Sequence, residues 1–469
     1  FILINFLKAK MDKKKVVVVG AGITGLTVAY RLLKSKENFE VVVLESEKQT
    51  GGKLKTSPFS GFLLDEGADA FLARAPWAKE LFDEIGISEE FVSPHSRSAS
   101  IWVNGSLEPL PSPNVLGIPL DPHSVPPGLL NSDDVLKISK GGRPSKKLPE
   151  EADVAIGDLI RDCVGDSVFE LFVDPLLGGI NAGIPDEMSC ETLAPQLLEA
   201  ARHEDGLIAG LKETQQNSDP ELPVFYTHPN GIGHIVERLA EKISNSIRKN
   251  EHVISISRAN NQWILKTSTG LEAADALVLA TPAQNAARLL ETVSPTASSR
   301  LSDIEHASVS LVSLAFKKSD INIPKNQSGF LVPRSAGLLM TACSFSGNKW
   351  EHLDDEKQTL LRVSSGRVDD QRHETLNDEE LVKNLMNDLA VTLGLDSQPF
   401  ESRVNRWPEA LAQFKPGHLK RMKETIDLLD DEAPGLSIAG SYHFGVGIPA
   451  CVRSGNEVAV SVIEKFGKN

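Results

Sequence analysis

The chain has 469 residues, of which 41% are hydrophobic and 24% are charged, and its formal net charge is −15. This length predicts two or three domains, and the composition is typical of a water-soluble globular protein. The acidic balance argues against a nucleic-acid partner and against simple electrostatic attachment to anionic lipid. No apolar run is long enough for a transmembrane helix. The cysteines form no C-x-x-C pair, which is typical of reduced thiols in a cytosolic protein; they are Cys163, Cys190, Cys343 and Cys451.

Residues 1–10 precede Met11 and lack the cleavage-site pattern of a signal peptide. We expect this stretch to be a leader, a tag or an upstream-read extension, with the natural start near Met11. The predicted fold therefore begins at Met11.

A glycine-rich turn lies between a strand predicted at residues 16–19 and a helix predicted at 26–33. Its three glycines, Gly20, Gly22 and Gly25, form a G-x-G-x-x-G motif. In such a turn the first glycine allows the tight bend, the second lets the backbone approach a pyrophosphate, and the third lets the helix pack on the strand. The phosphates then meet unpaired amides at the positive end of the helix dipole.

A second strand, predicted at 40–44, ends at Glu45, about 20 residues after the glycine motif, where an acidic side chain accepts hydrogen bonds from a ribose. Together these features predict a dinucleotide site; an ordinary strand–helix–strand unit with a glycine turn is the alternative. Between residues 57 and 72 we expect a short hairpin followed by the loop Asp65-Glu66-Gly67-Ala68-Asp69. A helix is predicted over 77–85, with Gly86 as its stop.

The next part of the chain is expected to be mainly helical. A strand at 100–103 precedes Asn104-Gly105, a strong hairpin signal. Residues 111–147 are rich in proline and serine and are expected to form a loop of low order, with a mobile lid over a pocket as the alternative. Apolar periodicity from 155 to 210 predicts a helical insertion. The glycine-rich stretch 176–183 is interpreted as a helix stop followed by tight turns.

The remaining sequence predicts a return to strands and helices. A helix follows the turn at 229–233, and a helix over 377–393 has Asn377 as its cap and Gly394 as its stop. Residues 403–407 enter a proline turn, and a final helix runs from 455 to 466. Strands are expected at 252–256, 263–267 and 276–282, and the strands of an antiparallel sheet at 309–316, 329–332, 338–345 and 360–364.

Together with the glycine motif at 20–25 and Glu45, five further stretches resemble the motifs of the protoporphyrinogen/coproporphyrinogen oxidases, in their soluble bacterial form, within the flavin-containing amine oxidase superfamily. They are Gly51-Gly52-Lys53 after the acidic strand end, the loop at 65–68, residues 174–183, Arg406-Trp407 and residues 445–449. The similarity runs along nearly the whole chain after Met11. The stretches 174–183 and 445–449 separate this family from monoamine and polyamine oxidases, whose Tyr-Met-Glu-Gly-Ala pattern near the end is absent here.

The resemblance implies FAD as the cofactor and an α/β fold combined with an antiparallel sheet. A discontinuous Rossmann-like FAD domain would comprise residues 11–95, 225–290 and 431–469. Residues 96–224 would form a helical insertion that corresponds to the membrane-binding domain of the family, and residues 291–430 would form a sheet-based substrate domain.

The resemblance also implies the cofactor contacts. The glycine motif holds the pyrophosphate, Glu45 the ribose and Lys53 a phosphate, while Val253 contacts the adenine side through its backbone. The segment 67–70 lines the flavin, and Trp407 closes over it together with 446–448; a core tryptophan without cofactor contact is the alternative for Trp407. The full set of implied cofactor residues is Gly20, Ala21, Gly22, Ile23, Thr24, Gly25, Glu45, Ser46, Lys53, Gly67, Ala68, Asp69, Ala70, Val253, Trp407, Val446, Gly447 and Ile448.

The implied reaction is the six-electron oxidation of a porphyrinogen in haem synthesis, in three two-electron flavin turnovers, with oxygen as the final acceptor and hydrogen peroxide as a product. The flavin performs the hydride step, so no catalytic side chain is identified, and the sequence shows no Ser/His/Asp set, metal-ligand cluster or paired carboxylates. His443 could shuttle a proton, although a hydrogen-bonded structural histidine is the favoured interpretation. Two alternatives stay open. One is a flavin amine oxidase, although the chain has only three tyrosines to form the aromatic cage of such enzymes. The other is a non-enzymatic prenyl-GTPase escort protein of the same fold.

Coproporphyrinogen III is favoured over protoporphyrinogen IX as substrate, because an acidic chain without a membrane segment is more similar to the soluble bacterial form. Its four carboxylates need basic or amide groups at the pocket rim, for which the candidates are Arg97, Lys137, Arg161 and Arg334. We expect a cytoplasmic protein, at most peripheral at the membrane, with product handover to a ferrochelatase; the oligomeric state is left open. Strands that present alternate side chains suit a flat macrocycle, so the pocket is predicted at 329–331, 339–342 and Val363, with Gly329, Phe330, Leu331, Leu339, Val363 and Arg97 as substrate contacts.

Overall fold

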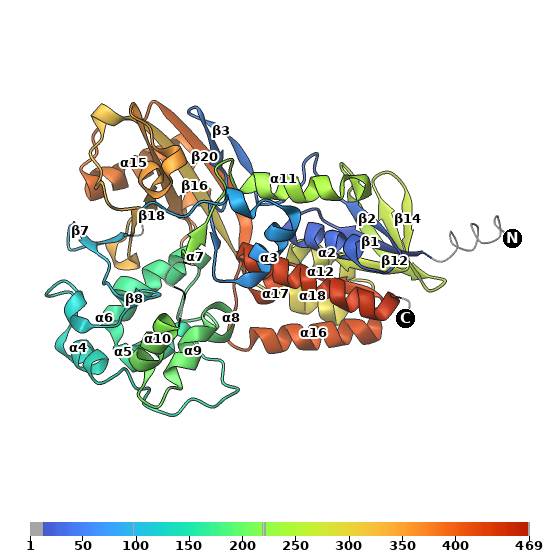
Figure 1. The fold of residues 1–469 in the computed structure, drawn as a ribbon, viewed down its shortest axis with the longest axis horizontal. Helices are drawn as coiled ribbons and strands as arrows, with labels where there is room; N and C mark the ends of the chain where they lie inside the picture. The colour runs from blue at the N-terminus through green and yellow to red at the C-terminus, as the bar shows by residue number, and fades with distance from the viewer. Residues whose placement is uncertain (1–12, 97, 218, 220–221, 468–469) are drawn as a thin grey trace.

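The computed structural model describes residues 13–96, 98–217, 219 and 222–467 (Figure 1). The expected leader at residues 1–10 and the substrate candidate Arg97 lie outside this part of the chain. A five-stranded parallel sheet, in the order β11-β2-β1-β15-β21, forms the centre of one half of the molecule. Its strands are β1 (Lys14–Val19), β2 (Phe39–Leu44), β11 (Ile247–Arg248), β15 (Ala276–Leu279) and β21 (Leu436–Ile438).

The valine run of β1 explains why this sheet is covered on both faces. Because successive side chains of a strand point to opposite faces, Val16 and Val18 join one core and Val17 and Val19 join another. All four are at most 6% exposed, which confirms the predicted strand buried on both faces. The first core contains α2 (Ile23–Lys34), α3 (Pro76–Ile85), α11 (Ile232–Lys242) and α18 (Ile448–Phe466). The second contains the three-stranded sheet β12 (Val253–Ala259), β13 (Gln262–Thr267) and β14 (Leu271–Ala274), with α12 (Ala283–Leu290), α13 (Pro295–Ser302) and α16 (His418–Glu432).

A seven-stranded sheet, in the order β20-β16-β19-β18-β17-β6-β7, forms the other half. Its neighbours are antiparallel except β17 and β6. Helix α15 (Asp378–Leu393) packs on one face of this sheet. As predicted, Asn377 caps this helix and Gly394 ends it in the left-handed conformation. The strands are β6 (Ser100–Val103), β7 (Ser106–Pro109), β16 (His306–Lys317), β17 (Gly329–Leu331), β18 (Met340–Phe345), β19 (Gln358–Ser365) and β20 (Glu401–Ala412).

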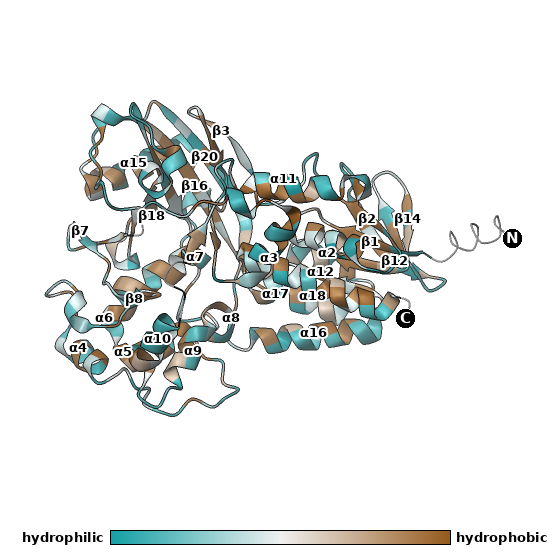
Figure 2. Ribbon diagram, in the orientation of Figure 1, coloured by the Kyte–Doolittle hydropathy of each residue, from teal (hydrophilic) through white to brown (hydrophobic). Residues whose placement is uncertain are grey.

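Three elements near the C-terminal end differ from the prediction. Strand β20 continues through Pro408 instead of turning there, because it lies at the edge of the sheet, where a residue without an N–H is tolerated. Helix α18 begins at Ile448 rather than at 455, with Pro449 in its first turn. Helix α16 was not predicted, although Figure 2 shows its polar and apolar residues alternating along the outside of the molecule. Its buried residues follow a helical period: His418, Met422, Thr425 and Leu429.

The predicted insertion is helical, as expected, and has its own core. The expectation of a loop of low order at 111–147 is wrong in part, because the segment contains β8 (Asn114–Val115), β9 (Ile118–Pro119) and α4 (Ser132–Ser139). The helix expected to stop at 176 continues through the π-helical segment η3 (Phe169–Gly178) and α7 (Gly179–Asn181) to Ala182, where a φ of 49° ends it. The other helices are α5 (Ile156–Val164), α6 (Asp166–Val168), α8 (Cys190–Leu193), α9 (Pro195–Ala201) and α10 (Leu207–Gln216).

Small hairpins complete the fold. The predicted turn Asn104-Gly105 closes the hairpin β6–β7, which extends the seven-stranded sheet although it falls in the range 96–224 assigned to the insertion. The domain boundaries otherwise stay predictions. None of the helices in the described part of the chain is long and apolar enough to cross a membrane. The remaining elements include β3 (Thr56–Phe59) paired with β4 (Phe62–Asp65), β5 (Phe71–Leu72) paired with β10 (Phe225–Tyr226), and the helices α14 (Ser346–Lys349) and α17 (Ser441–Phe444).

Candidate active site

The glycine motif forms an open cradle between β1 and α2. Gly20 has a φ of +103°, and a Cβ there would lie 2.6 Å from the carbonyl oxygen of Ala280, so only glycine fits. A Cβ on Gly25 would overlap the carbonyl oxygen of Gly20, whereas a Cβ on Gly22 would meet no atom within 4 Å. Gly22 caps α2 without a side-chain hydrogen bond. The first-turn amides of α2, at Ile23 and Thr24, are therefore free to bind an anion such as a pyrophosphate.

Glu45 lies directly beside this cradle and is 8% exposed. One carboxylate oxygen accepts a hydrogen bond from the Ala21 amide at 2.7 Å, and the other accepts from Ser46 Oγ at 3.2 Å and from the Glu47 amide at 2.9 Å. The oxygen that accepts from Ala21 has a further lone pair that could accept a ribose hydroxyl. The Glu45 carbonyl also accepts from the Glu251 amide, which leads into β12 and Val253. The geometry fits the dinucleotide role of Glu45, and the adenine contact of Val253 stays a prediction.

The second glycine turn lies against the first. The Gly51 amide donates to the Ala21 carbonyl at 2.8 Å, and Gly51 and Gly22 form a parallel bridge. The Lys53 side chain extends to β20, where its ammonium group donates to the Ala410 carbonyl. Burial lowers the pKa of Lys53, and a nearby phosphate would oppose that shift. Phosphate binding by Lys53 stays a prediction.

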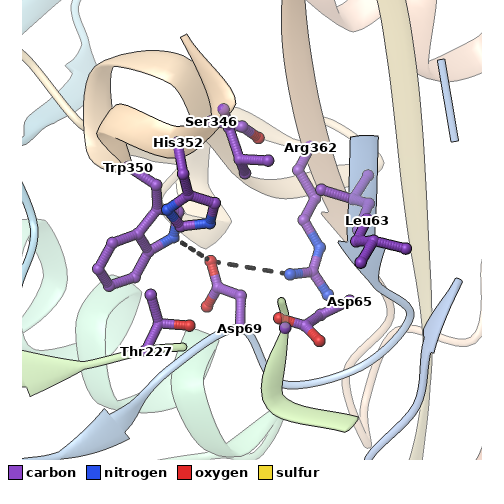
Figure 3. Close-up of a pocket in the computed structure, with 11 residues that line it drawn as sticks. Leu63, Asp65, Asp69, Thr227, Ser346, Trp350, His352 and Arg362 are labelled. Atoms are coloured by element: carbon purple, nitrogen blue, oxygen red, sulfur yellow. Dashed lines mark hydrogen bonds and ion pairs between the residues drawn. The ribbon is translucent and has the colours of Figure 1, made fainter. Parts of the chain in front are cut away.

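The residues of segment 67–70 lie in different surroundings, some beside Trp407 and some in the interior. Trp407 donates from its indole N–H to the Glu66 carbonyl at 2.8 Å, and its ring lies 3.6 Å from the position of a Cβ on Gly67. Trp407 is half-buried and belongs to none of the apolar core clusters among the described residues. Ala68 is exposed, whereas the Asp69 carboxylate points into a small pocket that Trp350 and Arg362 also line (Figure 3). Ala70 packs against the core between β3–β4 and the seven-stranded sheet.

Helix α18 packs against the first turns of α2. A Cβ on Gly455 would lie 2.8 Å from the Thr24 carbonyl oxygen, so glycine permits the close packing of the two helices. Gly447 caps α18 without a side-chain hydrogen bond, and Val446 and Ile448 flank it. Helix α18 therefore packs directly on the helix that follows the glycine motif.

His443 precedes α18 and is buried. Its ring stacks on Phe444 with centroids 3.8 Å apart, and its Nδ1 has no partner among the described residues. Burial, with His418 and Arg453 nearby, lowers the pKa of His443 to about 4, so the imidazole is neutral at pH 7. The expected hydrogen-bonded role is therefore not seen at Nδ1.

The two faces of the seven-stranded sheet have different environments, and this separates the predicted substrate contacts. Phe330, Leu339 and Val363 are at most 8% exposed and belong to the core against α15. A Cβ on Gly329 would overlap the Cys343 carbonyl oxygen, so this residue serves close strand packing. Leu331 points to the opposite face. Substrate binding by these residues stays a prediction, which the packing favours only for Leu331.

The opposite face carries a row of half-buried side chains across five strands. Asn405 pairs with Leu311, Leu311 with Ser364, Ser364 with Ala342, and Ala342 with Leu331. Directly paired residues point to the same side of a sheet. Trp407 is two residues along β20 from Asn405 and shares this face, which we call the open face. Only Leu331 and Ala342 of this row fall in the stretches that were predicted to form the pocket. The signal that could have identified this face is the alternation of side chains along the strand, counted from Trp407.

Three basic residues predicted at the rim of the substrate pocket already have ion-pair or hydrogen-bond partners in the structure. Arg334 pairs with Asp174 at 3.0 Å and with Asp369. Arg161 pairs with Asp166 at 2.6 Å and lies over the Phe169 ring. The ammonium group of Lys137 donates to the Arg161 carbonyl at 2.8 Å. None of these three cations lacks a partner within the part of the chain that the structure describes.

One cluster has metal-binding residue types, although the sequence shows no such spacing. Ligand atoms of Glu90, His228 and His234 lie within 4.8 Å of one another. However, His228 Nδ1 accepts a hydrogen bond from the Asn230 amide at 3.0 Å. The neutral ring then carries its proton on Nε2, which lies 3.2 Å from Glu90. That proton occupies the position a metal would need, so a His–Glu hydrogen bond explains the cluster.

Comparison with known proteins agrees with this geometry. Residues 23–463 match the family described as flavin containing amine oxidoreductase. The coproporphyrinogen III oxidase of Bacillus subtilis (strain 168) is 30% identical over 468 residues, covering 96% of this chain and 97% of that protein. The coproporphyrinogen III oxidase of Mycobacterium bovis is 32% identical over 466 residues, covering 97% and 98%. A crystal structure from Exiguobacterium sp. 255-15, provisionally assigned as a protoporphyrinogen oxidase, has a TM-score of 0.86 and 29% identity, covering 96% of this chain and 98% of that chain. The chain therefore belongs to the flavin-containing amine oxidoreductase family and is a flavin-dependent oxidoreductase.

Proposed function

We propose that this protein oxidises a porphyrinogen, with coproporphyrinogen III as the favoured substrate, and uses FAD as its cofactor. The observation that carries the proposal is the row of half-buried side chains on the open face, beside Trp407 and Gly67. A flat, mostly apolar wall of this kind suits a macrocycle. The names of the relatives at 30% and 32% identity point to the same substrate class.

In this proposal the parallel sheet is a Rossmann-like FAD domain. The cradle at Gly22 and the free amides of α2 would hold the pyrophosphate, and Glu45 would hold the ribose. The backbone of Gly67 and the ring of Trp407 would lie against the flavin, with the positive end of α18 at Gly447 stabilising negative charge there. The residues fit FAD because a Cβ at Gly22 would meet no protein atom within 4 Å, which leaves open space beside the first turn of α2.

Bound FAD supplies two-electron oxidation, and three turnovers account for the six electrons that separate a porphyrinogen from a porphyrin. The chain's own contribution is to orient the macrocycle on the open face and to exclude water from it. We expect molecular oxygen to be the final acceptor and hydrogen peroxide to accumulate, which a peroxidase-coupled assay measures. An amine oxidase predicts peroxide from amines and none from porphyrinogens.

The substrate experiment compares coproporphyrinogen III and protoporphyrinogen IX side by side, by porphyrin fluorescence. We expect the larger kcat/KM for coproporphyrinogen III. A preference for protoporphyrinogen IX by about tenfold, roughly 1.4 kcal/mol of transition-state discrimination, would overturn this choice but not the reaction class. If neither substrate reduces the bound flavin anaerobically, the proposed function is wrong.

A matched pair of variants tests the place of the substrate. Ala342→Phe adds a ring to the half-buried row on the open face, so we expect kcat/KM to fall at least tenfold while the FAD content stays unchanged. Val391→Phe adds a similar ring on the exposed side of α15, where Val391 is 58% exposed, and should leave kcat/KM within twofold. Equal effects of the two substitutions would argue against substrate binding on the open face.

A further inference from the structure

Asp69 connects the segment beside Trp407 to the seven-stranded sheet. Its carboxylate accepts from the Lys349 ammonium at 2.9 Å and from the Trp350 indole N–H at 3.3 Å, and it lies 3.7 Å from the Arg362 guanidinium. Lys349 ends α14 and Arg362 lies in β19, so all three donors belong to the sheet half of the molecule. Figure 3 shows the carboxylate turned between Trp350 and Arg362.

Arg362 holds the same segment at a second point. Its guanidinium also donates to the Gly67 carbonyl, two residues before Asp69. Arg362 is 8% exposed and Lys349 is 19% exposed, so these ion pairs are largely shielded from water. Burial opposes ionisation of Asp69, but Lys349 and Arg362 outweigh it and hold the pKa of Asp69 well below its ordinary value.

The arrangement fixes geometry more than it adds stability. Removing charges from water offsets most of their mutual attraction, so a buried ion pair contributes little net stability compared with apolar packing. What this network does instead is hold the Gly67 backbone in place where it lies against the ring of Trp407. A misplacement of about 1 Å at a reacting group can slow a reaction by roughly 100-fold.

We propose that Asp69 is a positioning residue, whose ion pairs with Lys349 and Arg362 fix the Gly67–Ala68 backbone and thereby orient the flavin for hydride transfer. The inference rests on the proposed placement of the flavin beside Gly67 and Trp407. It assigns Asp69 a role through the loop backbone rather than by direct contact with the cofactor, because its carboxylate is already bound by Lys349 and Trp350.

The test compares the holoenzyme with Asp69→Asn, which keeps the shape of the side chain and removes its charge. We expect one FAD per chain to be retained, the visible circular dichroism of the bound flavin to change, and the anaerobic rate of flavin reduction at saturating coproporphyrinogen III to fall at least tenfold. KM should stay within twofold. Asp83→Asn is the matched control, since Asp83 pairs with Lys79 on the surface at 2.8 Å, and it should change none of these.

A second variant tests the same inference if Asp69→Asn folds poorly. Lys349→Met removes one donor and leaves Arg362 on both Asp69 and Gly67, so we expect the same spectral change with a smaller fall in the reduction rate. The double variant should reduce no more slowly than Asp69→Asn, because both act through one network. A lower melting temperature with wild-type spectrum and reduction rate would mean a merely structural role and would overturn the inference. A wild-type protein that neither porphyrinogen reduces would instead overturn the proposed function.

Discussion

Two alanine substitutions in the glycine motif should separate cofactor binding from folding. Gly22 has a φ of −73°, which alanine adopts without strain, and its Cβ would meet no protein atom within 4 Å. Gly25 lies three residues further, and its Cβ would overlap the Gly20 carbonyl oxygen and approach Ala280 Cβ at 3.1 Å. We therefore expect Gly22→Ala to weaken FAD binding alone and Gly25→Ala to weaken the fold.

The magnitudes follow from these contacts. Overpacking against backbone destabilises by about 1–3 kcal/mol, which is the expected loss in unfolding free energy for Gly25→Ala. In the proposed FAD site, the methyl group added at Gly22 would occupy the space of a phosphate. Loss of one charge-assisted hydrogen bond, about 1.5–3 kcal/mol, raises the dissociation constant for FAD roughly 10- to 150-fold.

Thermal unfolding at increasing FAD concentration distinguishes the two effects. A ligand that binds only the folded state stabilises it by RT ln(1 + [L]/Kd), so the deficit of Gly22→Ala should shrink as FAD is raised, while that of Gly25→Ala should persist at saturation. Wild-type FAD affinity in Gly22→Ala would refute the assignment of this cradle to the pyrophosphate. A deficit in Gly22→Ala that saturating FAD does not repair would refute the claim that the space is open.

Three further predictions concern stability. Asn377→Ala removes the capping box of α15 and should lower the unfolding free energy by about 1 kcal/mol in urea titrations, with unchanged FAD content. Arg334→Met leaves Asp174, 7% exposed, without its ion-pair partner and should lower the unfolding free energy by about 3 kcal/mol; Arg143→Met, whose partner Asp205 is exposed, should lower it by less than about 1 kcal/mol. Burial raises the pKa of Asp65 to about 6, with Thr56 and Arg362 opposing the shift. Between about pH 4 and 6 the Asp65 carboxyl keeps its proton in the native state but has lost it in the unfolded chain, so the free energy of unfolding falls as pH rises. We expect this fall to be larger in the wild type than in Asp65→Asn, by up to about 3 kcal/mol. Parallel pH profiles of the two proteins would contradict this.

The parallel-sheet half could be predicted closely because its signals are local. Four consecutive valines, a glycine turn and an acidic strand end lie within about one supersecondary unit, and each has a direct physical meaning. The start of α18 was missed because Gly447 and Pro449 resemble loop residues, although glycine as a cap and proline in the first turn are ordinary at a helix start. The continuation of β20 through Pro408 could not be predicted, since its edge position depends on strand order.

The candidate site was predictable in its backbone motifs but less so in its side chains. The glycine cradle and Glu45 lie together in the structure, as the spacing indicates. By contrast, Phe330 and Val363 belong to the core against α15 and not to the predicted pocket. A short apolar run does not reveal which of its side chains point to which face of the sheet, or which face a helix covers. Arg362 was missed for a related reason: one arginine within an apolar strand has no motif, and its partners lie almost 300 residues away in sequence.

One hydrogen bond, from Trp407 to Glu66, determines which side chains of the seven-stranded sheet lie on the open face. The bond from Trp407 to Glu66 turns that face of β20 toward the loop, and the pairing of β20 with β16 and of β16 with β19 places Arg362 on the same face. A slip of β19 by one residue would send Val363 to the open face and bury Arg362 against α15 without its carboxylate. An unpaired buried charge destabilises by about 3–5 kcal/mol, which is comparable with a large part of a domain's total stability. The ion pairs that we propose to position the loop at Asp69 therefore also specify the strand register on which the open face depends.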